Sequence, residues 1–192
     1  PYNESLGLDK IGIDLSETGR IKVDKNFQTN IEGIFAIGDV IEGPMLAHKA
    51  EEDGVAAVEI MAGISGHVDY NLIPGVVYTN PEVASIGKTE QELKDIGQSF
   101  NKGTFPFLAN SRARATGDTQ GFVKLLADSE TDKLLGAHII GLNAGTLIHE
   151  IATAMAFGAS AEDIARTCHA HPTMNEAVKE AALSIGSGAI HI

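Results

Sequence analysis

The sequence predicts an α+β fold, in which helices cover one side of an antiparallel sheet. After about residue 69, segments typical of strands come first along the chain and segments typical of helices follow, and this order favours segregated helices over alternating βα units. Before that point one predicted strand runs into a long helix, which is too little for a complete domain. We therefore expect one full domain over residues 69–192, preceded over residues 1–68 by a segment of an α/β domain.

The first part of the chain contains three predicted elements. Arg20–Val23 is typical of a short strand and Gly33–Ile37 of a buried strand. Met45–Met61 has small apolar residues at helical spacing, which predicts a helix. We place the division between the two parts near Gly63–Asn71.

The second part begins with a predicted strand at Gly75–Tyr78 and a helix at Thr89–Ile96, where Thr89 and Glu92 have the spacing of a capping box. Further strands and then helices follow from the hydrophobic pattern. The strands are Phe100–Phe107, Phe122–Ala127 and Leu134–Ile140, and the helices are Ala144–Phe157, Ser160–Thr167 and Thr173–Ile185.

Composition excludes several classes of function. Acidic residues outnumber basic ones by 26 to 14, and the basic residues are dispersed, which argues against nucleic acid and anionic membranes as partners. No apolar run approaches the ~20 residues that span a bilayer, and no signal-peptide pattern opens the chain. The single cysteine, Cys168, cannot form a disulfide within the chain and fits a reducing compartment, and we expect no metal site.

A histidine and a glutamate stand close together near the end of the sequence. Pro172 disfavours the α region for the residue before it, so His171 should lie on an extended corner. Thr173 is a good N-cap, and Glu176 then falls in the first turn of the helix. The Glu176 carboxylate can reach the His171 ring and form an acid/base pair, or reach the Thr173 backbone and complete a capping box.

A second candidate site follows the predicted strand at Gly33–Ile37. Gly38 and Asp39 would lie at the carboxyl end of this strand, where open α/β sheets place ligands, although an ordinary turn aspartate has the same pattern. The next helix begins near Met45, Leu46 and Ala47, and its free N–H groups favour an electron-rich ligand atom.

Several ordered segments, which together run through most of the chain, resemble the dihydrolipoamide dehydrogenase family of flavoprotein disulfide reductases. They are Thr29–Asp39, Gly43–Gly54, Tyr78–Ala84, Phe105–Ala113 and His169–Glu176.

The resemblance implies that FAD and NAD are the cofactors. It places Asp39 against the ribityl chain of the flavin and the backbone of Met45, Leu46 and Ala47 against its pyrimidine edge. It makes His171 and Glu176 the acid/base pair for dithiol oxidation. It places the redox-active disulfide and both glycine-rich nucleotide loops upstream of Pro1, so we expect the C-terminal part of a longer enzyme that is inactive alone.

The resemblance also implies partners. We expect a homodimer in which the C-terminal dimerisation (interface) domain of one subunit completes the active site of the other. We expect lipoyl domains of 2-oxo acid dehydrogenase complexes or of the glycine cleavage system as substrates, in the bacterial cytoplasm or the mitochondrial matrix. The segment over residues 1–68 would then be the end of the nucleotide-binding region and the C-terminal segment of the FAD-binding domain.

Two alternatives stay open. A flavin disulfide reductase of the glutathione or trypanothione type shares His-Pro-Thr but not the flanking residues, and a noncatalytic dimerisation module would need no cofactor. Among neighbouring residues, we expect packing or solvated roles for His48 and Lys49 and surface or interface positions for His149 and Glu150. His169 could support His171 by a hydrogen bond or be purely structural.

Overall fold

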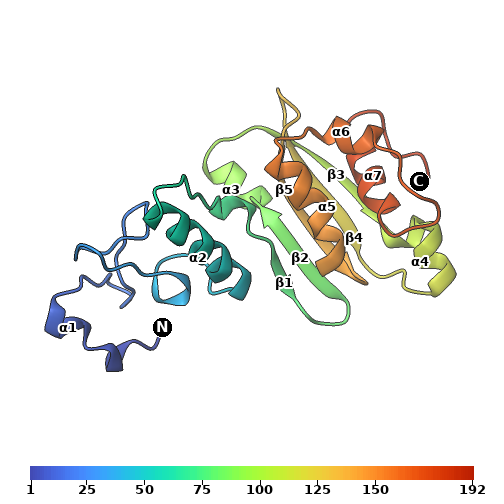
Figure 1. Ribbon diagram of the computed structural model, residues 1–192. Coiled ribbons are helices and arrows are strands. Elements are labelled where there is room, and N and C mark those ends of the chain that lie inside the picture. Colours follow the sequence, from blue (N-terminus) through green and yellow to red (C-terminus); the bar gives the residue numbers. More distant parts are fainter. The chain divides into compact units, whose positions relative to one another are not determined.

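The computed structural model describes residues 1–192 and divides after Tyr70 into two units, Pro1–Tyr70 and Asn71–Ile192 (Figure 1). The expected boundary lay between residues 68 and 69. Each unit has its own cluster of buried apolar side chains.

The first unit is largely irregular around one long helix, α2 (Ala47–Met61). Its other elements are short turns of helix: η1 (Glu4–Leu6), α1 (Leu8–Ile11) and η2 (Gly38–Val40), while η3 (Tyr70–Leu72) straddles the boundary. Its buried apolar core consists of Ile13, Ile21, Phe27, Ala36, Ile41, Ala56 and Ala57.

Both strands predicted in the first unit are wrong. The segment 20–23 contributes only an isolated bridge between Leu15 and Ile21, and the segment 33–37 only one between Gln28 and Phe35. A strand needs a neighbouring strand to satisfy its backbone groups along its length. Here the two segments bury apolar side chains such as Ile21 and Ala36 without a ladder, so their hydrophobic pattern reports burial rather than a sheet.

The second unit is built on a five-stranded sheet in the order β1-β2-β5-β4-β3, in which every neighbouring pair is antiparallel. The strands are β1 (Gly75–Val77), β2 (Glu82–Gly87), β3 (Phe100–Pro106), β4 (Phe122–Asp128) and β5 (Leu134–Gly141). Four of them match predicted strands. The strand β2 was not predicted, because the two residues that it buries, Ala84 and Ile86, give only a weak alternating pattern.

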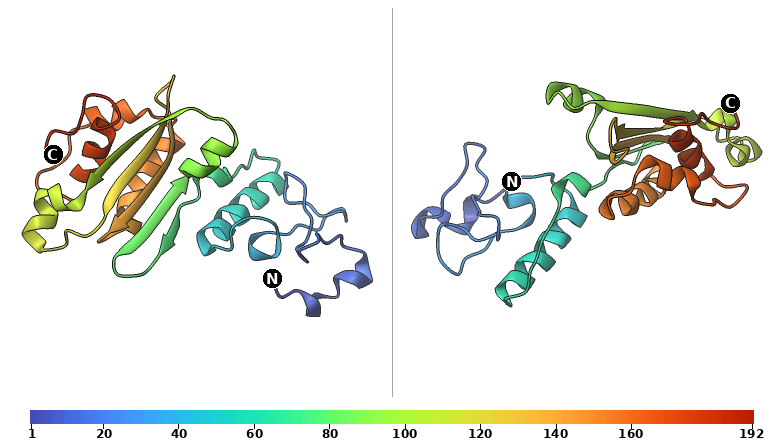
Figure 2. Two further views of the ribbon diagram at one scale, coloured as in Figure 1. Left: turned by 180° about the vertical axis from the view of Figure 1, so that it is seen from behind. Right: turned by 90° about the horizontal axis from the view of Figure 1, so that it is seen from above.

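Helices cover one face of this sheet, which confirms the α+β fold (Figure 2). The helix α5 (Ala144–Ala156) packs on β5 and β2, and α7 (Glu176–Leu183) packs on β3 and β4. Between them in the chain, α6 (Ala161–Arg166) packs against α7. The short elements α3 (Glu90–Asp95), η4 (Phe107–Ala109) and α4 (Ser111–Thr116) lie at the ends of strands.

The approach of α7 to the sheet is close enough to require a glycine. A Cβ atom on Gly103 of β3 would overlap the carbonyl oxygen of Ala181 in α7. The helix turns its small side chains, Ala177, Ala181 and Ala182, toward the core, where each is almost completely buried. These buried side chains fix which face of α7 lies against the sheet.

Candidate active site

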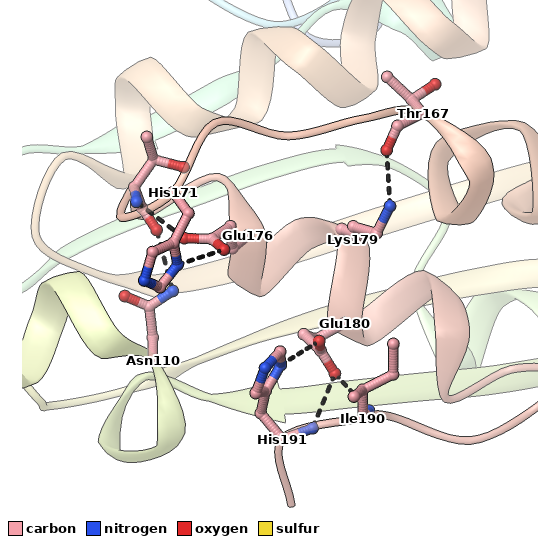
Figure 3. A network of polar contacts seen from close by, with 9 residues as sticks. Asn110, Thr167, His171, Glu176, Lys179, Glu180, Ile190 and His191 are labelled. Carbon is pink, nitrogen blue, oxygen red and sulfur yellow. Dashed lines mark hydrogen bonds and ion pairs between the residues drawn. The ribbon is translucent and has the colours of Figure 1, made fainter.

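The His171 and Glu176 side chains meet at the start of α7. The distance from His171 Nδ1 to Glu176 Oε1 is 2.9 Å, and the Thr173 backbone N–H donates to Glu176 Oε2 over 2.9 Å (Figure 3). Both contacts that the sequence left as alternatives for Glu176 thus occur together, one on each oxygen of the carboxylate, but the capping box is not completed. The segment 168–173 that carries His171 is neither helix nor strand.

The contacts of Glu176 keep its carboxyl group ionised. Burial by itself would raise the pKa of Glu176, but the hydrogen bonds from Thr173 and His171 and the charges of His171 and His191 together lower this pKa below its usual value. A carboxylate on Nδ1 favours the tautomer that carries its proton there, which leaves Nε2 of His171 as the basic nitrogen. The His171 side chain is 66% exposed, so an incoming group can reach the ring.

The start of α7 differs from the prediction. Thr173 does not cap the helix: its hydroxyl donates to the Ala170 carbonyl, and the helix begins at Glu176 after a turn through Asn175. The physical reason is local competition, since a threonine hydroxyl can satisfy a nearby carbonyl instead of a helix N–H group. Glu176 is therefore at the first helical position, where its negative charge also faces the positive end of the helix dipole.

A second group of contacts holds the corner before His171. His169 Nε2 lies 2.6 Å from Glu150 Oε1, and Asn175 Nδ2 donates to Glu150 Oε2 over 2.7 Å. His169 Nδ1 lies 2.9 Å from the Thr167 carbonyl oxygen. Both ring nitrogens of His169 thus face oxygen atoms, which hold the ring in place. His169 thus contacts Thr167 and Glu150 rather than His171, which is the structural alternative, and Glu150 links α5 to the segment before His171.

The other side of the corner is held by Asn110. Its amide Nδ2 donates to the Thr173 carbonyl over 3.0 Å, and its Oδ1 accepts from the Ala113 N–H at the start of α4. Only 3% of Asn110 is exposed, and its side chain links the start of α4 to the segment that carries His171. It belongs to a segment that carried the family resemblance, but its contact with Thr173 could not be read from the sequence.

A second histidine–glutamate pair lies next to the first and was also missed. His191 Nδ1 is 2.7 Å from Glu180 Oε1, and the Ile190 N–H donates to Glu180 Oε2 over 2.7 Å (Figure 3). The spacing of Glu176 and Glu180, one helical turn apart, is the signal that could have placed both carboxylates on one face of α7. Both pairs line one small recess, together with Phe105, Ala109, Asn110 and Ser111.

In the first unit, the predicted cofactor-facing residues lie at η2 and at the start of α2. Asp39 is exposed on η2, and Met45 is 59% exposed just before the helix. Leu46 precedes the first helical residue, Ala47, and makes no side-chain cap, so the first N–H groups of α2 lack helical partners. An exposed carboxylate beside the start of a helix fits a ligand with both hydroxyl groups and electron-rich heteroatoms, as a flavin has, while the Leu46 N–H already donates to the Pro44 carbonyl over 3.1 Å.

The turn at Gly38 is held to α2 by a buried ion pair. Lys49 Nζ lies 2.7 Å from Asp53 Oδ2, and both side chains are completely buried. Asp53 Oδ2 also accepts from the Gly38 N–H, while Lys49 donates to the Gly38 carbonyl, each over 3.0 Å. Since removing one partner of a buried pair costs about 3–5 kcal/mol, these contacts fix η2 on the helix. The packing role expected for Lys49 is confirmed.

Tyr70 completes this buried network. Its hydroxyl donates to Asp53 Oδ1 over 2.8 Å, and its ring centroid lies 5.2 Å from Lys49 Nζ. Burial and the hydrogen bond to Asp53 raise the pKa of the Tyr70 phenol above its usual range, so the group remains a donor.

Two further findings concern metal binding and membrane-spanning helices. No group of three or more His, Cys, Asp or Glu side chains is arranged to hold a metal ion. No helix has the length and apolar character needed to cross a membrane.

The second unit thus combines an antiparallel sheet with a histidine–glutamate pair at the start of a covering helix. The chain belongs to the pyridine nucleotide-disulphide oxidoreductase family: the model of its dimerisation domain matches residues 73–182, and a second model of the family matches residues 1–54.

The chain is similar to the following proteins along most of its length. The chain is 60% identical over 192 residues to the mitochondrial dihydrolipoyl dehydrogenase of Pisum sativum, covering all of this chain and 38% of that protein. It is 62% identical over 184 residues to leghemoglobin reductase of Glycine max, covering 96% of this chain and 35% of that protein. The crystal structure of LpdA from Mycobacterium tuberculosis superposes with a TM-score of 0.88 at 27% identity, over 95% of this chain and 40% of that one. The chain thus spans well under half the length of these relatives.

Proposed function

We propose that this chain is the C-terminal part of a flavin-dependent dihydrolipoamide dehydrogenase, which oxidises protein-bound dihydrolipoamide with NAD⁺ as the electron acceptor. The observation that carries the proposal is the His171–Glu176 pair, with Nδ1 and Oε1 2.9 Å apart and the ring exposed. The similarity to the dihydrolipoyl dehydrogenase of Pisum sativum along the whole chain supports the choice of substrate.

His171 is the general base in this proposal. Oxidation of a dithiol to a disulfide releases two electrons and two protons, and it proceeds through a thiolate, whereas a free thiol with a pKa of about 8.5 is mostly protonated at neutral pH. Nε2 of His171 takes the thiol proton and later returns it, a contribution typically worth about 10²–10⁴-fold in rate.

Glu176 positions the base. Its Oε1 accepts the Nδ1–H of His171, which orients the ring and stabilises the imidazolium formed when Nε2 takes up a proton. Its Oε2 is held by the Thr173 N–H, so the carboxylate does not have to reorient as the charge appears.

The cofactors would be FAD and NAD, as the family membership of the chain supports. Bound flavin and nicotinamide supply the electron acceptors for dithiol oxidation. In this chain, the Asp39 carboxylate and the backbone of Met45, Leu46 and Ala47 would hold part of the flavin, with η2 kept in place by Lys49 and Asp53.

The proposed assembly is a homodimer, which the match to the family's dimerisation domain supports. The base of one subunit would then serve the disulfide of the other. The proposed partners are the lipoyl domains of 2-oxo acid dehydrogenase complexes or of the glycine cleavage system. The proposed location is the mitochondrial matrix or the bacterial cytoplasm, and the names of the mitochondrial relatives favour the matrix.

The test replaces His171 in the full-length enzyme that carries this chain. The variant His171→Gln should oxidise dihydrolipoamide at least about 10²-fold more slowly while retaining its flavin spectrum, because the proton acceptor is lost but the cofactor contacts are not. Glu176→Gln should cost less, since it disturbs orientation only. Exposed His67 provides the matched control, and His67→Gln should be unaffected. Near-normal turnover of His171→Gln would exclude this residue as the base.

Two alternatives are separated by other measurements. A reductase of the glutathione or trypanothione type would prefer those disulfides to lipoamide in a substrate panel, and the similarity to leghemoglobin reductase makes leghemoglobin a further member of that panel. A noncatalytic dimerisation module would be colourless and inactive with every substrate, even at full length.

The 192-residue chain alone should neither retain FAD nor form NADH. Asp39 and the start of α2 offer only a part of a flavin site, whereas dinucleotide binding also uses a glycine-rich loop at a helix N-terminus. Cys168 also has no second sulfur in this chain with which to form a disulfide. The purified chain should be mixed with FAD, NAD⁺ and dihydrolipoamide and followed at the absorbance of NADH. Turnover on the order of 10 s⁻¹ would overturn this prediction.

A further inference from the structure

The end of the chain folds back onto α7 beside the candidate base. The carboxylate of Glu180 is buried, with 5% of its side chain exposed, and it accepts hydrogen bonds from the Ile190 backbone and from the His191 ring, each over 2.7 Å. Burying a carboxylate is costly unless it is paired and hydrogen-bonded. The segment Ile190–His191 supplies these partners, so Glu180 anchors the tail at this point of the helix (Figure 3).

The anchored tail brings a second imidazole to the candidate site. The recess that contains His171 and Glu176 is lined also by Glu180 and His191. The remaining lining residues, Phe105, Ala109, Asn110 and Ser111, carry no ionisable side chain. Across this recess His171 faces the two carboxylates on α7 and the His191 ring, which is 62% exposed. The other ionisable groups bonded to its segment are Glu150 of α5, which contacts His169, and Lys179 of α7, which donates to the Thr167 carbonyl.

We propose that Glu180 and His191 are positioning residues of the site, whose opposite charges set how readily the His171–Glu176 pair takes up a proton. The proposal rests on the proposed role of His171 as the base. Glu180 adds a negative charge one helical turn from Glu176 and favours a protonated His171. His191, when protonated, opposes that effect, and it acts on Glu176 through its charge. The negative charge of Glu180 and the positive charge of His191 thus have opposite effects on the protonation of His171.

This balance predicts opposite effects for two conservative variants. His191→Asn keeps a nitrogen donor for Glu180 but removes the positive charge, so the titration midpoint of His171 should rise. Glu180→Gln keeps an acceptor for the Ile190 N–H but removes the negative charge, so the midpoint should fall. A unit charge several ångströms away in a solvent-rich setting corresponds to a shift of about 0.4 pH unit in each direction.

Histidine NMR titration of the 192-residue chain measures these midpoints without any dependence on catalysis. The His171 resonance is assigned with His171→Gln, and thermal unfolding verifies that each variant remains folded. His149→Asn, at an exposed histidine on α5, is the matched control and should leave the midpoint unchanged. In the full-length enzyme, the pH profile of kcat/KM should shift in parallel with the NMR midpoints.

Shifts of opposite sign support the proposal. Shifts of the same sign in both variants, or no shift in either, would overturn it, because a tail that only stabilises α7 predicts no such sign reversal. Failure of the proposed function is a separate result: His171→Gln would then retain turnover, while the NMR midpoints would still respond to the two charges. If one variant unfolds, the kcat/KM profile of the other decides by its direction.

Discussion

A single carboxylate performs two tasks at the start of α7, and this division is visible only in three dimensions. Glu176 directs one oxygen to the His171 ring and the other to the Thr173 backbone. The sequence predicted each contact as an alternative, because both lie within reach of a first-turn glutamate. It could not predict Glu180 or Lys49 as buried charges, since burial of a polar side chain depends on which distant segments cover it.

The lowered pKa of Glu176 predicts how this residue stabilises the fold. Because the folded-state pKa lies below the usual value of 4.5, ionised Glu176 stabilises the folded chain above that pH, and this contribution is lost as the pH falls through the lowered pKa. Glu176→Gln should therefore lower Tm at neutral pH, by an amount corresponding to roughly 1 kcal/mol.

The measurement is thermal unfolding of both proteins from pH 7 to pH 3. The gap between their Tm values should close toward the acidic end. Glu162→Gln, which removes an exposed ion pair with Arg166, serves as the control and should change Tm little at any pH. A gap for Glu176→Gln that stays constant over the whole range would contradict the assignment.

At the scale of elements, strands with strong alternation and helices with clear caps were predictable. The capping box at Thr89 and Glu92 is confirmed, and α3 begins where it predicts. The strand β2 and the start of α7 were not predictable, because small residues weaken the alternating pattern of β2 and Thr173 bonds to Ala170 instead of capping. The burial of small residues by the rest of the fold decides the first case, and local hydrogen bonding decides the second.

The close contact between α7 and β3 gives a test at this scale. Gly103→Ala should destabilise the second unit by about 1–3 kcal/mol, because the added methyl group overlaps the Ala181 carbonyl and forces the helix away from the sheet. Gly186→Ala, just after α7, is the control, since a Cβ atom there meets no neighbour. Urea unfolding of both variants measures the difference. Equal stabilities would show that α7 can shift without cost.

At the scale of the whole molecule, the second unit was predicted better than the first, because it contains a complete sheet and its covering helices. The strands predicted in the first unit are wrong because its apolar segments pack around α2 without strand partners of their own. A hydrophobic pattern records that a segment is buried, but it does not record whether a neighbouring strand is present in the same chain.

Exposed apolar side chains on the second unit predict self-association. Val77 and Tyr78 at the edge strand β1 are 57% and 84% exposed, and Phe157 at the end of α5 is 87% exposed. Together with the dimerisation domain that the family model matches, these residues lead us to expect a dimer at micromolar concentration. Analytical ultracentrifugation measures this. A folded chain that sediments as a monomer at that concentration would show that its interface needs further residues.

The buried pair of Lys49 and Asp53 holds the turn at Gly38 in place before any cofactor binds. Both backbone groups of Gly38 are already engaged by these side chains, so the turn that carries Asp39 has its final shape within the protein alone. A ligand that binds there spends little of its interaction energy on ordering the chain, and more of it remains as affinity. Lys49 and Asp53 need never touch that ligand to determine how tightly it is held.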